Sequence, residues 1–388
     1  MTKHENSPAK PTGCIVLADG TAFYGHGFGA EGSAIAELCF NTAMTGYQEI
    51  MTDPSYAGQV VTFTFPHIGN TGTNSEDNEA AAPGALGMIV KWDPTEPSNW
   101  RNTEELGDWL RRHGRIGVGG VDTRRLTRAI RQQGAPHVAI AFNPDGDFDL
   151  AKMVKQARDF SGLEGLDLAK EVTCAQSYQW NEMRWAWPEG FSKRTTPGHK
   201  VVALDYGAKR NILRCLASAG CDVTVLPATA TADEVLAHNP KGIFLSNGPG
   251  DPAATGEYAV PMIQEILEKT ELPVFGICLG HQMLALALGG KTLKMNHGHH
   301  GANHPVKEID TGKVEITSMN HGFAVDADTL PENVEQTHVS LFDGSNCGIR
   351  MKNRPVFSVQ QHPEASPGPQ DSYYLFERFV ASMEQAAQ

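Results

Sequence analysis

One cysteine in this chain of 388 residues stands between two glycines, in the stretch PVFGICLGHQMLAL that begins at Pro273. Gly276 and Gly280 permit a sharp turn from a strand into a helix with Cys278 at its apex, the thiol counterpart of a nucleophile elbow. Backbone N–H groups at a helix start favour thiolate, and the N–H of Leu279 would face a developing oxyanion. Most free cysteines are simply small buried residues, so this stretch alone supports a buried thiol and a nucleophile equally.

A second stretch, FSVQQHPEASPGP, offers a base and a residue to orient it. His362 and Glu364 follow a β-rich run, and the proline between them stiffens the loop that holds both side chains on one side. In isolation His362 is equally compatible with a surface histidine. Considered jointly with Cys278, the pair favours a Cys-His-Glu arrangement for nucleophilic catalysis.

A third stretch, SNGPGDP, is a glycine-rich loop after a strand-like run. Gly248 and Gly250 allow backbone N–H groups to approach a substrate oxygen, as an oxyanion site requires. The alternatives are a plain turn and a phosphate cradle, but a P-loop needs Gly-Lys-Ser/Thr, which this loop lacks.

Strands must position these loops, and the pattern from residue 199 onward alternates buried strand runs with helical runs. This alternation predicts an α/β domain over 199–388 with an open, mainly parallel doubly wound sheet, whose strand carboxyl ends collect the loops. Residues 12–145 contain short β-rich runs and few helical patterns, which indicates a mixed α/β domain. We expect 146–198 to be a connecting region and 1–11 a disordered tail.

The composition of the chain limits the classes of partner that it can bind. Lys and Arg number 32 against 45 Asp and Glu, and the net charge of −13 argues against nucleic acid and anionic membranes. The Arg-rich stretch near Asp122 and Thr123 is interpreted as a helix start with a solvated or intersubunit face. Seven scattered cysteines without a C-x-x-C pair, a polar start and the lack of a long apolar run predict a soluble cytoplasmic protein.

Two further motifs carry no cofactor prediction. GFGAEG, from Gly27, matches G-x-G-x-x-G, yet the residues after it turn β-like, so we expect no dinucleotide. The histidines at 297, 299, 300 and 304 match no common zinc spacing, so we expect no metal.

The three loops in this order resemble the class I (triad) glutamine amidotransferases, with G-x-C-x-G-x-Q at 276–282 and H-P-E at 362–364. The resemblance implies that Cys278 attacks the side-chain amide of L-glutamine, that His362 shuttles the proton to departing ammonia and that Glu364 orients the imidazolium. Water would then hydrolyse the glutamyl thioester.

The amino-terminal half extends the resemblance. FNTAMTGYQEIMTDPSYAGQVV, PHIGNTGTNSED and GVDTRRLTRAIRQ resemble the small subunit of carbamoyl-phosphate synthetase, as do GHHGANHPV and MNHGFAVD. That family implies delivery of ammonia to a large subunit, which makes carbamoyl phosphate from bicarbonate with ATP and Mg²⁺ for arginine and pyrimidine synthesis. It implies a heterodimer, with higher oligomers left open, and no cofactor in this chain.

The resemblance also implies a glutamine site, carried over position by position. It consists of Ser55, Gly248, Gly250, Leu279, Gln282, Asn320, Gly322 and Phe323. Two alternatives remain at this point. Beside the leading interpretation as the glutaminase subunit of carbamoyl-phosphate synthetase stand the glutaminase of another synthase, such as one making anthranilate or GMP, and a non-catalytic scaffold that senses glutamine.

Overall fold

The computed structural model describes residues 10–386, and the chain divides into two compact units. The first unit comprises residues up to 41 together with 58–77 and 85–162. The second comprises 42–57, 78–84 and the chain from 163 onward. Two short segments from the amino-terminal half therefore belong to the second unit, an assignment that the sequence pattern did not predict.

The first unit is a closed barrel with the strand order β1-β2-β6-β5-β4-β3-β7. Its strands are β1 (Gly13–Leu17), β2 (Ala22–Gly29), β3 (Gly32–Asn41), β4 (Gln59–Phe63), β5 (Gly87–Ile89), β6 (Ile116–Gly119) and β7 (His137–Phe142). The alternation of a strand explains the packing, because Ile15 and Leu17 join one apolar cluster and Cys14 and Val16 join another. GFGAEG forms the end of β2 and the turn into β3.

In the described part of this unit, the barrel is accompanied by α2 (Leu106–Arg112), α3 (Thr123–Gln133) and α4 (Leu150–Asp159). The side chain of Asp122 caps α3 by accepting a hydrogen bond from the Arg125 N–H at 3.0 Å, which confirms the predicted helix start. The buried faces of α3 and α4 join the two barrel clusters.

The second unit contains a ten-stranded sheet in the order β16-β15-β17-β18-β19-β14-β13-β11-β12-β8. Five neighbouring strands are parallel: β12 (Cys221–Pro227), β11 (His199–Asp205), β13 (Gly242–Leu245), β14 (Val274–Ile277) and β19 (Val356–Val359). The remaining strands pair antiparallel: β8 (Tyr178–Trp180), β15 (Lys291–Glu308), β16 (Val314–Asp326), β17 (Val334–Ser340) and β18 (Asn346–Met351).

The sheet is therefore mixed, and the expectation of a mainly parallel sheet holds only for its centre. The chain from 291 to 351 passes through β15–β18 without a crossover α-helix. Strands that follow one another through short connections run antiparallel, because a parallel neighbour needs a long crossover.

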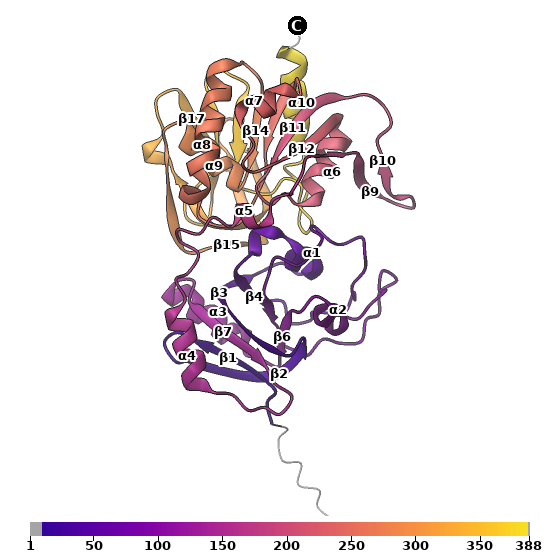
Figure 1. Ribbon diagram of the computed structural model, residues 1–388, viewed down its shortest axis with the longest axis vertical. Helices are drawn as coiled ribbons and strands as arrows, with labels where there is room; N and C mark the ends of the chain where they lie inside the picture. The colour runs from indigo at the N-terminus through magenta and orange to yellow at the C-terminus, as the bar shows by residue number, and fades with distance from the viewer. Residues whose placement is uncertain (1–9, 387–388) are drawn as a thin grey trace, which may run out of the picture. The chain divides into compact units, whose positions relative to one another are not determined.

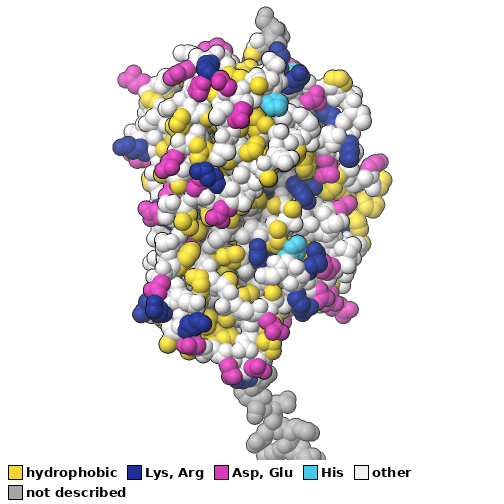
Figure 2. Space-filling view, viewed as in Figure 1, with side chains coloured by type: hydrophobic (Ala, Val, Ile, Leu, Met, Phe, Trp, Pro, Cys, Tyr) yellow, Lys and Arg dark blue, Asp and Glu magenta, His cyan; other side chains and the backbone are white. Residues whose placement is uncertain are grey.

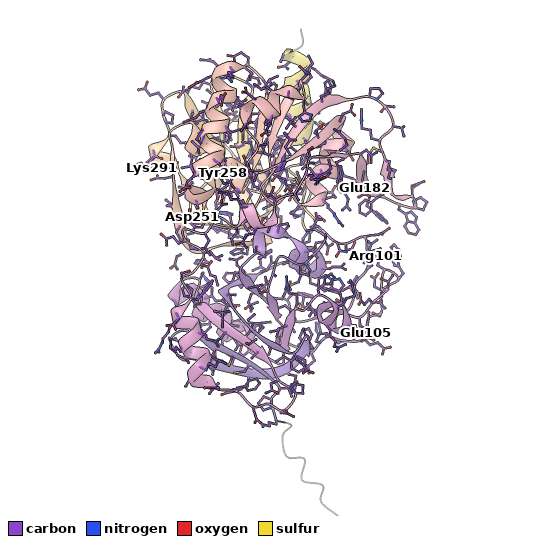
Figure 3. The ribbon with its side chains drawn as sticks, in the orientation of Figure 1. Arg101, Glu105, Glu182, Asp251, Tyr258 and Lys291 are labelled. Carbon is purple, nitrogen blue, oxygen red and sulfur yellow. The ribbon has the colours of Figure 1, made fainter. Side chains whose placement is uncertain are left out.

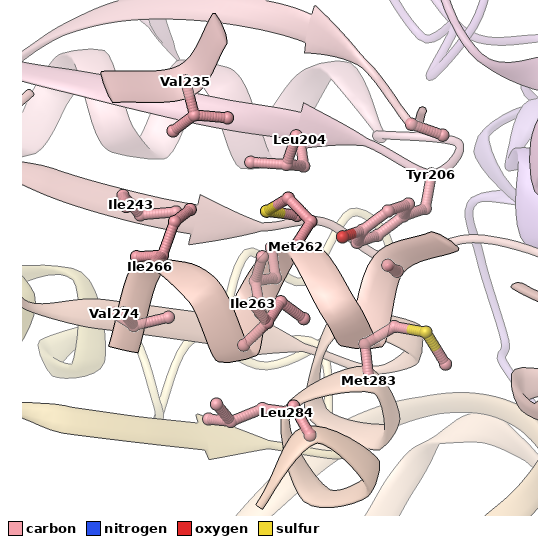
Figure 4. Packing of buried hydrophobic residues seen from close by; sticks show 14 of the residues in the cluster. Leu204, Tyr206, Val235, Ile243, Met262, Ile263, Ile266, Val274, Met283 and Leu284 are labelled. Atoms are coloured by element: carbon pink, nitrogen blue, oxygen red, sulfur yellow. The ribbon is translucent and has the colours of Figure 1, made fainter. Parts of the chain in front are cut away.

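Helices pack on both faces of this sheet (Figure 1). On one face lie α7 (Ala232–Ala237), α8 (Pro252–Lys269) and α9 (Leu279–Ala287); on the other lie α6 (Arg210–Ala219) and α10 (Tyr374–Ala386). Figure 4 shows the first cluster, where Leu204, Ile243 and Val274 from three strands meet Met262 and Ile263 of α8. The successive residues Val202 and Ala203 of β11 point to opposite faces of the sheet, so this strand packs against both helix layers.

The residues assigned to a connecting region divide between the two units. Helix α4 packs on the first unit, whereas Trp180 on β8 packs against the core of the second. A small hairpin of β9 (Glu182–Ala186) and β10 (Gly190–Lys193) follows, along with α5 (Ala169–Val172) before β8. Figure 3 labels Glu182, whose carboxylate accepts a 2.8 Å hydrogen bond from Arg214 on α6.

Surface character follows the composition. On the face shown in Figure 2, basic and acidic side chains are interspersed rather than gathered by sign. Between residues 10 and 386, every helix falls short of the length and apolar character that a bilayer crossing requires.

Candidate active site

Cys278 lies at the apex of a strained turn between β14 and α9. Its backbone has φ 53° and ψ −103°, a conformation that costs a non-glycine residue about 1–3 kcal/mol. A Cβ on Gly276 would stand 2.7 Å from the Gly280 carbonyl oxygen, and one on Gly280 would stand 2.2 Å from the Leu245 carbonyl oxygen. Both glycines are therefore required by close backbone approach, as the spacing predicts.

The turn is fixed by backbone hydrogen bonds from neighbouring strands. The Cys278 N–H donates to the Val359 carbonyl at 2.9 Å, and the Gly280 N–H donates to the Ser246 carbonyl at 2.9 Å. The Leu279 N–H is the first of α9, and an α-helix offers no internal acceptor to its first N–H groups. The strained turn at Cys278 is thus held by β19 and by the loop that follows β13.

His362 and Glu364 lie beside this turn, at the carboxyl end of β19. The Glu364 Oε1 atom accepts a hydrogen bond from His362 Nδ1 at 2.7 Å, and both side chains are almost completely buried. The His362 N–H donates to the Ser318 carbonyl of β16 at 2.9 Å, which fixes the start of the loop. Among residues 10–386, His362 Nε2 is buried and has no hydrogen-bond partner, so this nitrogen is free to exchange a proton with a bound substrate.

A buried lysine completes the charge arrangement. Lys209 Nζ donates to Glu364 Oε1 at 2.9 Å and to the Ala365 carbonyl at 2.8 Å. The sequence reasoning missed this residue; the available signal was a basic side chain just after β11, at the same sheet edge as the other loops. Glu364 therefore faces two cations, Lys209 and the protonated form of His362.

These partners decide the protonation states. Burial alone would lower the pKa of His362, but the charge of Glu364 and the adjacent Cys278 sulfur outweigh it and raise this pKa to about 10. Burial would raise the pKa of Glu364, whereas Lys209 and then His362 lower it to about 2. Burial opposes charge on Lys209 too, yet Glu364, Glu79 and Asp53 raise its pKa. The site is thus a buried network of ions at neutral pH.

The loop after Glu364 is also strained, with positive φ at Ala365 and Ser366. Three contacts hold it in place. Asn211 Nδ2 donates to the Glu364 carbonyl at 2.7 Å, Ser366 Oγ donates to Glu79 Oε1 at 2.6 Å, and Lys209 holds the Ala365 carbonyl. Glu79 comes from the 78–84 segment, so a residue distant in sequence stabilises the loop that carries the acid.

Two of the predicted glutamine-binding residues, Asn320 and Phe323, lie on β16 close to Cys278. The Asn320 carbonyl accepts a hydrogen bond from Cys278 Sγ at 3.5 Å. Gln282 Nε2 donates to the Phe323 carbonyl at 2.8 Å and to Gln360 Oε1 at 3.0 Å. The structure therefore brings Cys278, Gln282, Asn320 and Phe323 together.

Ser55 reaches the same place from the 42–57 segment. It lies in the short 3-10 helix η1 (Pro54–Tyr56), and its hydroxyl accepts a hydrogen bond from Asn247 Nδ2 at 2.9 Å. Asn247 belongs to the SNGPG loop, which the sequence marked for Gly248 and Gly250 but not for this amide. The amide joins Ser55 to the glycine-rich loop.

The remaining predicted residues occupy the same edge of the sheet. A Cβ on Gly248 would lie 2.1 Å from the Tyr206 carbonyl oxygen and 3.0 Å from Leu279 Cδ2, so the loop and α9 approach closely there. Gly250 has φ 96° just before Asp251, the residue that caps α8 and is labelled in Figure 3. Gly322 lies between Asn320 and Phe323 on β16.

The histidines of GHHGANHPV lie on β15 and have other uses. His300 Nδ1 donates to Asn320 Oδ1 at 2.9 Å, and His299 Nε2 lies 2.9 Å from Asp343 Oδ2. Across the described part of the chain, no group of three or more His, Cys, Asp or Glu side chains is arranged to hold a metal ion.

Models of two protein families match the sequence of the chain. Residues 202–382 match class I glutamine amidotransferases, and residues 15–140 match the CPSase domain of the carbamoyl-phosphate synthase small chain. The carboxy-terminal part thus carries a class I glutamine amidotransferase domain.

Curated relatives resemble the chain over nearly its whole length. Carbamoyl phosphate synthase small chains from Ruegeria pomeroyi, Mesorhizobium japonicum and Brucella anthropi are 78%, 66% and 65% identical to it. The alignments cover 98%, 96% and 96% of this chain and 98%, 94% and 92% of those proteins. The chain belongs to the carbamoyl phosphate synthase small chain family.

Proposed function

We propose that this chain hydrolyses L-glutamine to glutamate and ammonia through Cys278, His362 and Glu364. One observation carries the proposal: Cys278 is held in a strained conformation beside His362, whose pKa is raised to about 10 by a buried carboxylate and the sulfur itself. A nucleophile next to an oriented base is the arrangement that covalent amide hydrolysis needs. A merely structural thiol needs neither strain nor a charged partner.

The reaction follows from the positions of these groups. Cys278 Sγ, as the thiolate whose proton has passed to His362 Nε2, bonds to the side-chain carbonyl carbon of glutamine, and the Leu279 N–H and the SNGPG loop stabilise the oxyanion. The carbon–nitrogen bond then breaks, and His362 Nε2 supplies the proton with which ammonia leaves. Water, deprotonated by His362, attacks the thioester and releases glutamate and the thiol. Glu364 holds His362 Nδ1 throughout and stabilises its positive charge.

We propose Ser55, Gly248, Gly250, Leu279, Gln282, Asn320, Gly322 and Phe323 as the glutamine-binding residues. Polar side chains and backbone donors suit the α-amino and α-carboxylate groups of an amino acid, and the Phe323 ring suits its methylenes. Three contacts support this assignment: Asn320 accepts from Cys278, Gln282 donates to the Phe323 carbonyl, and Ser55 accepts from the glycine-rich loop.

The destination of the ammonia is proposed from the amino-terminal half. A small chain implies a large partner subunit, and the match over 15–140 favours carbamoyl-phosphate synthesis over another amidotransferase such as those making anthranilate or GMP. We propose that ammonia passes to the large subunit, which consumes bicarbonate and ATP with Mg²⁺ and makes carbamoyl phosphate.

The test compares the wild-type chain with Cys278→Ser, each mixed with a large subunit from a related bacterium. We expect glutamine-dependent carbamoyl phosphate from the wild type and a loss of at least about a thousandfold in the variant, because a hydroxyl lacks the thiol's acidity. Synthesis from added ammonium should continue in both mixtures, which shows that the complex is intact.

Two results would contradict the proposal. Equal, negligible rates of glutamine hydrolysis in both proteins would contradict the catalytic role of Cys278 and favour a non-catalytic scaffold that senses glutamine. Glutamine hydrolysis without carbamoyl phosphate, in a mixture that still uses ammonium, would point to another synthase as the partner.

A further inference from the structure

A buried carboxylate lies among the proposed glutamine-binding residues, and no step of the proposed reaction uses it. Asp53, at the amino end of η1, is only 4% exposed. It belongs to the 42–57 segment, which the chain supplies to the second unit from between β3 and β4. Burial of an unpaired carboxylate is costly, so its contacts must account for its presence.

Asp53 accepts hydrogen bonds from three different parts of the site. Oδ1 accepts from the Ser55 N–H at 2.9 Å and from Asn247 Nδ2 at 3.5 Å. Oδ2 accepts from Asn320 Nδ2 at 3.0 Å. One side chain thus touches η1, the SNGPG loop and β16, and each of these carries a proposed glutamine-binding residue.

A local role in the turn explains only one of these contacts. The bond to the Ser55 N–H is an ordinary cap of a short helix, which an asparagine or serine would make equally well. The bonds to Asn247 and Asn320 cross 194 and 267 residues of sequence. Both asparagines turn a donor nitrogen towards Asp53, so the position requires an acceptor on each side, as a carboxylate provides.

The orientation of Asn320 is fixed from its other end. Its Oδ1 accepts from His300 Nδ1 at 2.9 Å, while its backbone carbonyl faces Cys278 Sγ. Asn247 is likewise fixed, because its Oδ1 accepts from the Lys209 N–H at 3.0 Å while its Nδ2 donates to Ser55 Oγ. Neither amide can reverse without losing these partners.

We propose that Asp53 is a positioning residue for glutamine, which holds Ser55, Asn247 and Asn320 in the orientation that receives the α-amino and α-carboxylate groups. This inference rests on the glutaminase function proposed above. It also explains why the amino-terminal half contributes a segment to the second unit: the glutamine site is incomplete without the 42–57 segment.

The decisive variant is Asp53→Asn, which preserves size and removes one acceptor. The remaining oxygen can keep the Ser55 and Asn247 contacts, but the new amide nitrogen then faces Asn320 Nδ2, donor against donor. We expect the KM for glutamine to rise at least tenfold, equivalent to about 1.4 kcal/mol, with kcat within about threefold of the wild type. The readout is glutamine-dependent synthesis in the complex with the large subunit.

A second readout separates glutamine positioning from damage to the catalytic groups. Alkylation of Cys278 by iodoacetamide requires a reactive sulfur but no recognition of an amino acid, so its rate should stay within about twofold of the wild type. Glu315→Gln is the matched control. Glu315 is a fully buried carboxylate on the same strand as Asn320, but it accepts a hydrogen bond from Ser372 Oγ at 2.6 Å. The KM of the Glu315→Gln variant for glutamine should equal that of the wild type.

The outcomes are distinct. An unchanged KM in Asp53→Asn, with an active wild type, overturns the inference and leaves the proposed function standing. A rise in KM together with slower alkylation also overturns it, because Asp53 would then act on the cysteine through Lys209 rather than on glutamine. A wild type that makes no glutamine-dependent product contradicts the proposed function itself.

Discussion

Two buried histidines in the second unit, His362 and His300, have similar burial but differ in charge: His362 is protonated at neutral pH and His300 is neutral. Both are less than 5% exposed, and each makes a short hydrogen bond through Nδ1. The partner is the Glu364 carboxylate for His362 and the Asn320 amide oxygen for His300. The pKa of His362 is raised to about 10, whereas burial lowers the pKa of His300 to about 4.

The comparison shows that the partner, not the burial, decides what a histidine does here. A neutral acceptor cannot repay the loss of hydration, so His300 stays uncharged and serves as a hydrogen-bond donor. For His362, the Glu364 carboxylate and the Cys278 sulfur offset the loss of hydration, and this makes His362 the histidine suited to moving protons. His362 thus stabilises the fold below pH 6.5, and this contribution is lost as pH rises through 10.

Replacement of His362 by glutamine should have the largest effect. Glutamine keeps a donor for Glu364 but cannot exchange a proton, so kcat for glutamine hydrolysis should fall by about 10²–10⁴-fold. Ammonium-dependent synthesis with the large subunit should persist. The comparison fails if His362→Gln is no slower than His300→Gln.

Removal of the carboxylate should make His362 resemble His300. In Glu364→Gln the acceptor becomes neutral, so the pKa of His362 should fall by about one to three units. NMR titration of ¹⁵N-histidine-labelled protein, with His362→Gln to assign the signal, measures the shift. An unchanged titration would mean that the carboxylate does not set the charge of His362.

The proximity of the proposed catalytic residues could be predicted from the sequence because these residues lie in short motifs. Gly276 and Gly280 around Cys278, and the proline between His362 and Glu364, are local signals whose geometry depends on a few neighbouring residues. Strand–helix alternation likewise indicated the parallel centre of the sheet. The antiparallel strands from 291 to 351 lacked such a signal, because their pairing depends on turns and register rather than on periodicity.

The supporting residues could not be predicted, since their partners are distant in sequence. Lys209 meets Glu364 across 155 residues, and Glu79 meets Ser366 across 287. A buried charge has no local pattern in a single sequence; only the fold shows which opposite charge it faces. Asp53 lies within the stretch FNTAMTGYQEIMTDPSYAGQVV, but nothing in that stretch indicates a contact with Asn320.

His281 on α9 is a further buried histidine that we expect to be neutral, and the pH dependence of the free energy of unfolding tests this expectation. Burial lowers its pKa from 6.5 to about 3, so the unfolded chain binds a proton that the folded chain refuses as pH falls below 6.5. Between pH 7 and pH 5 this one group should remove about 2 kcal/mol of stability. In His281→Gln that part of the loss should vanish, as measured by urea unfolding at both pH values. An identical pH dependence in both proteins would mean that His281 is charged when buried.

The smallest effect should come from His300→Gln, and its pH dependence is the sharper measurement. A glutamine amide can still donate to Asn320 Oδ1, so the loss is a less favourable hydrogen bond of about 1 kcal/mol, or roughly a fivefold rise in KM for glutamine with kcat unchanged. Because the pKa of His300 is lowered to about 4, the histidine is neutral throughout pH 6–9, and the ratio of the two KM values should stay constant over that range. A ratio that falls towards one as pH rises above 7 would show that His300 works as a cation. The contrast with His362 would then rest on position rather than on charge.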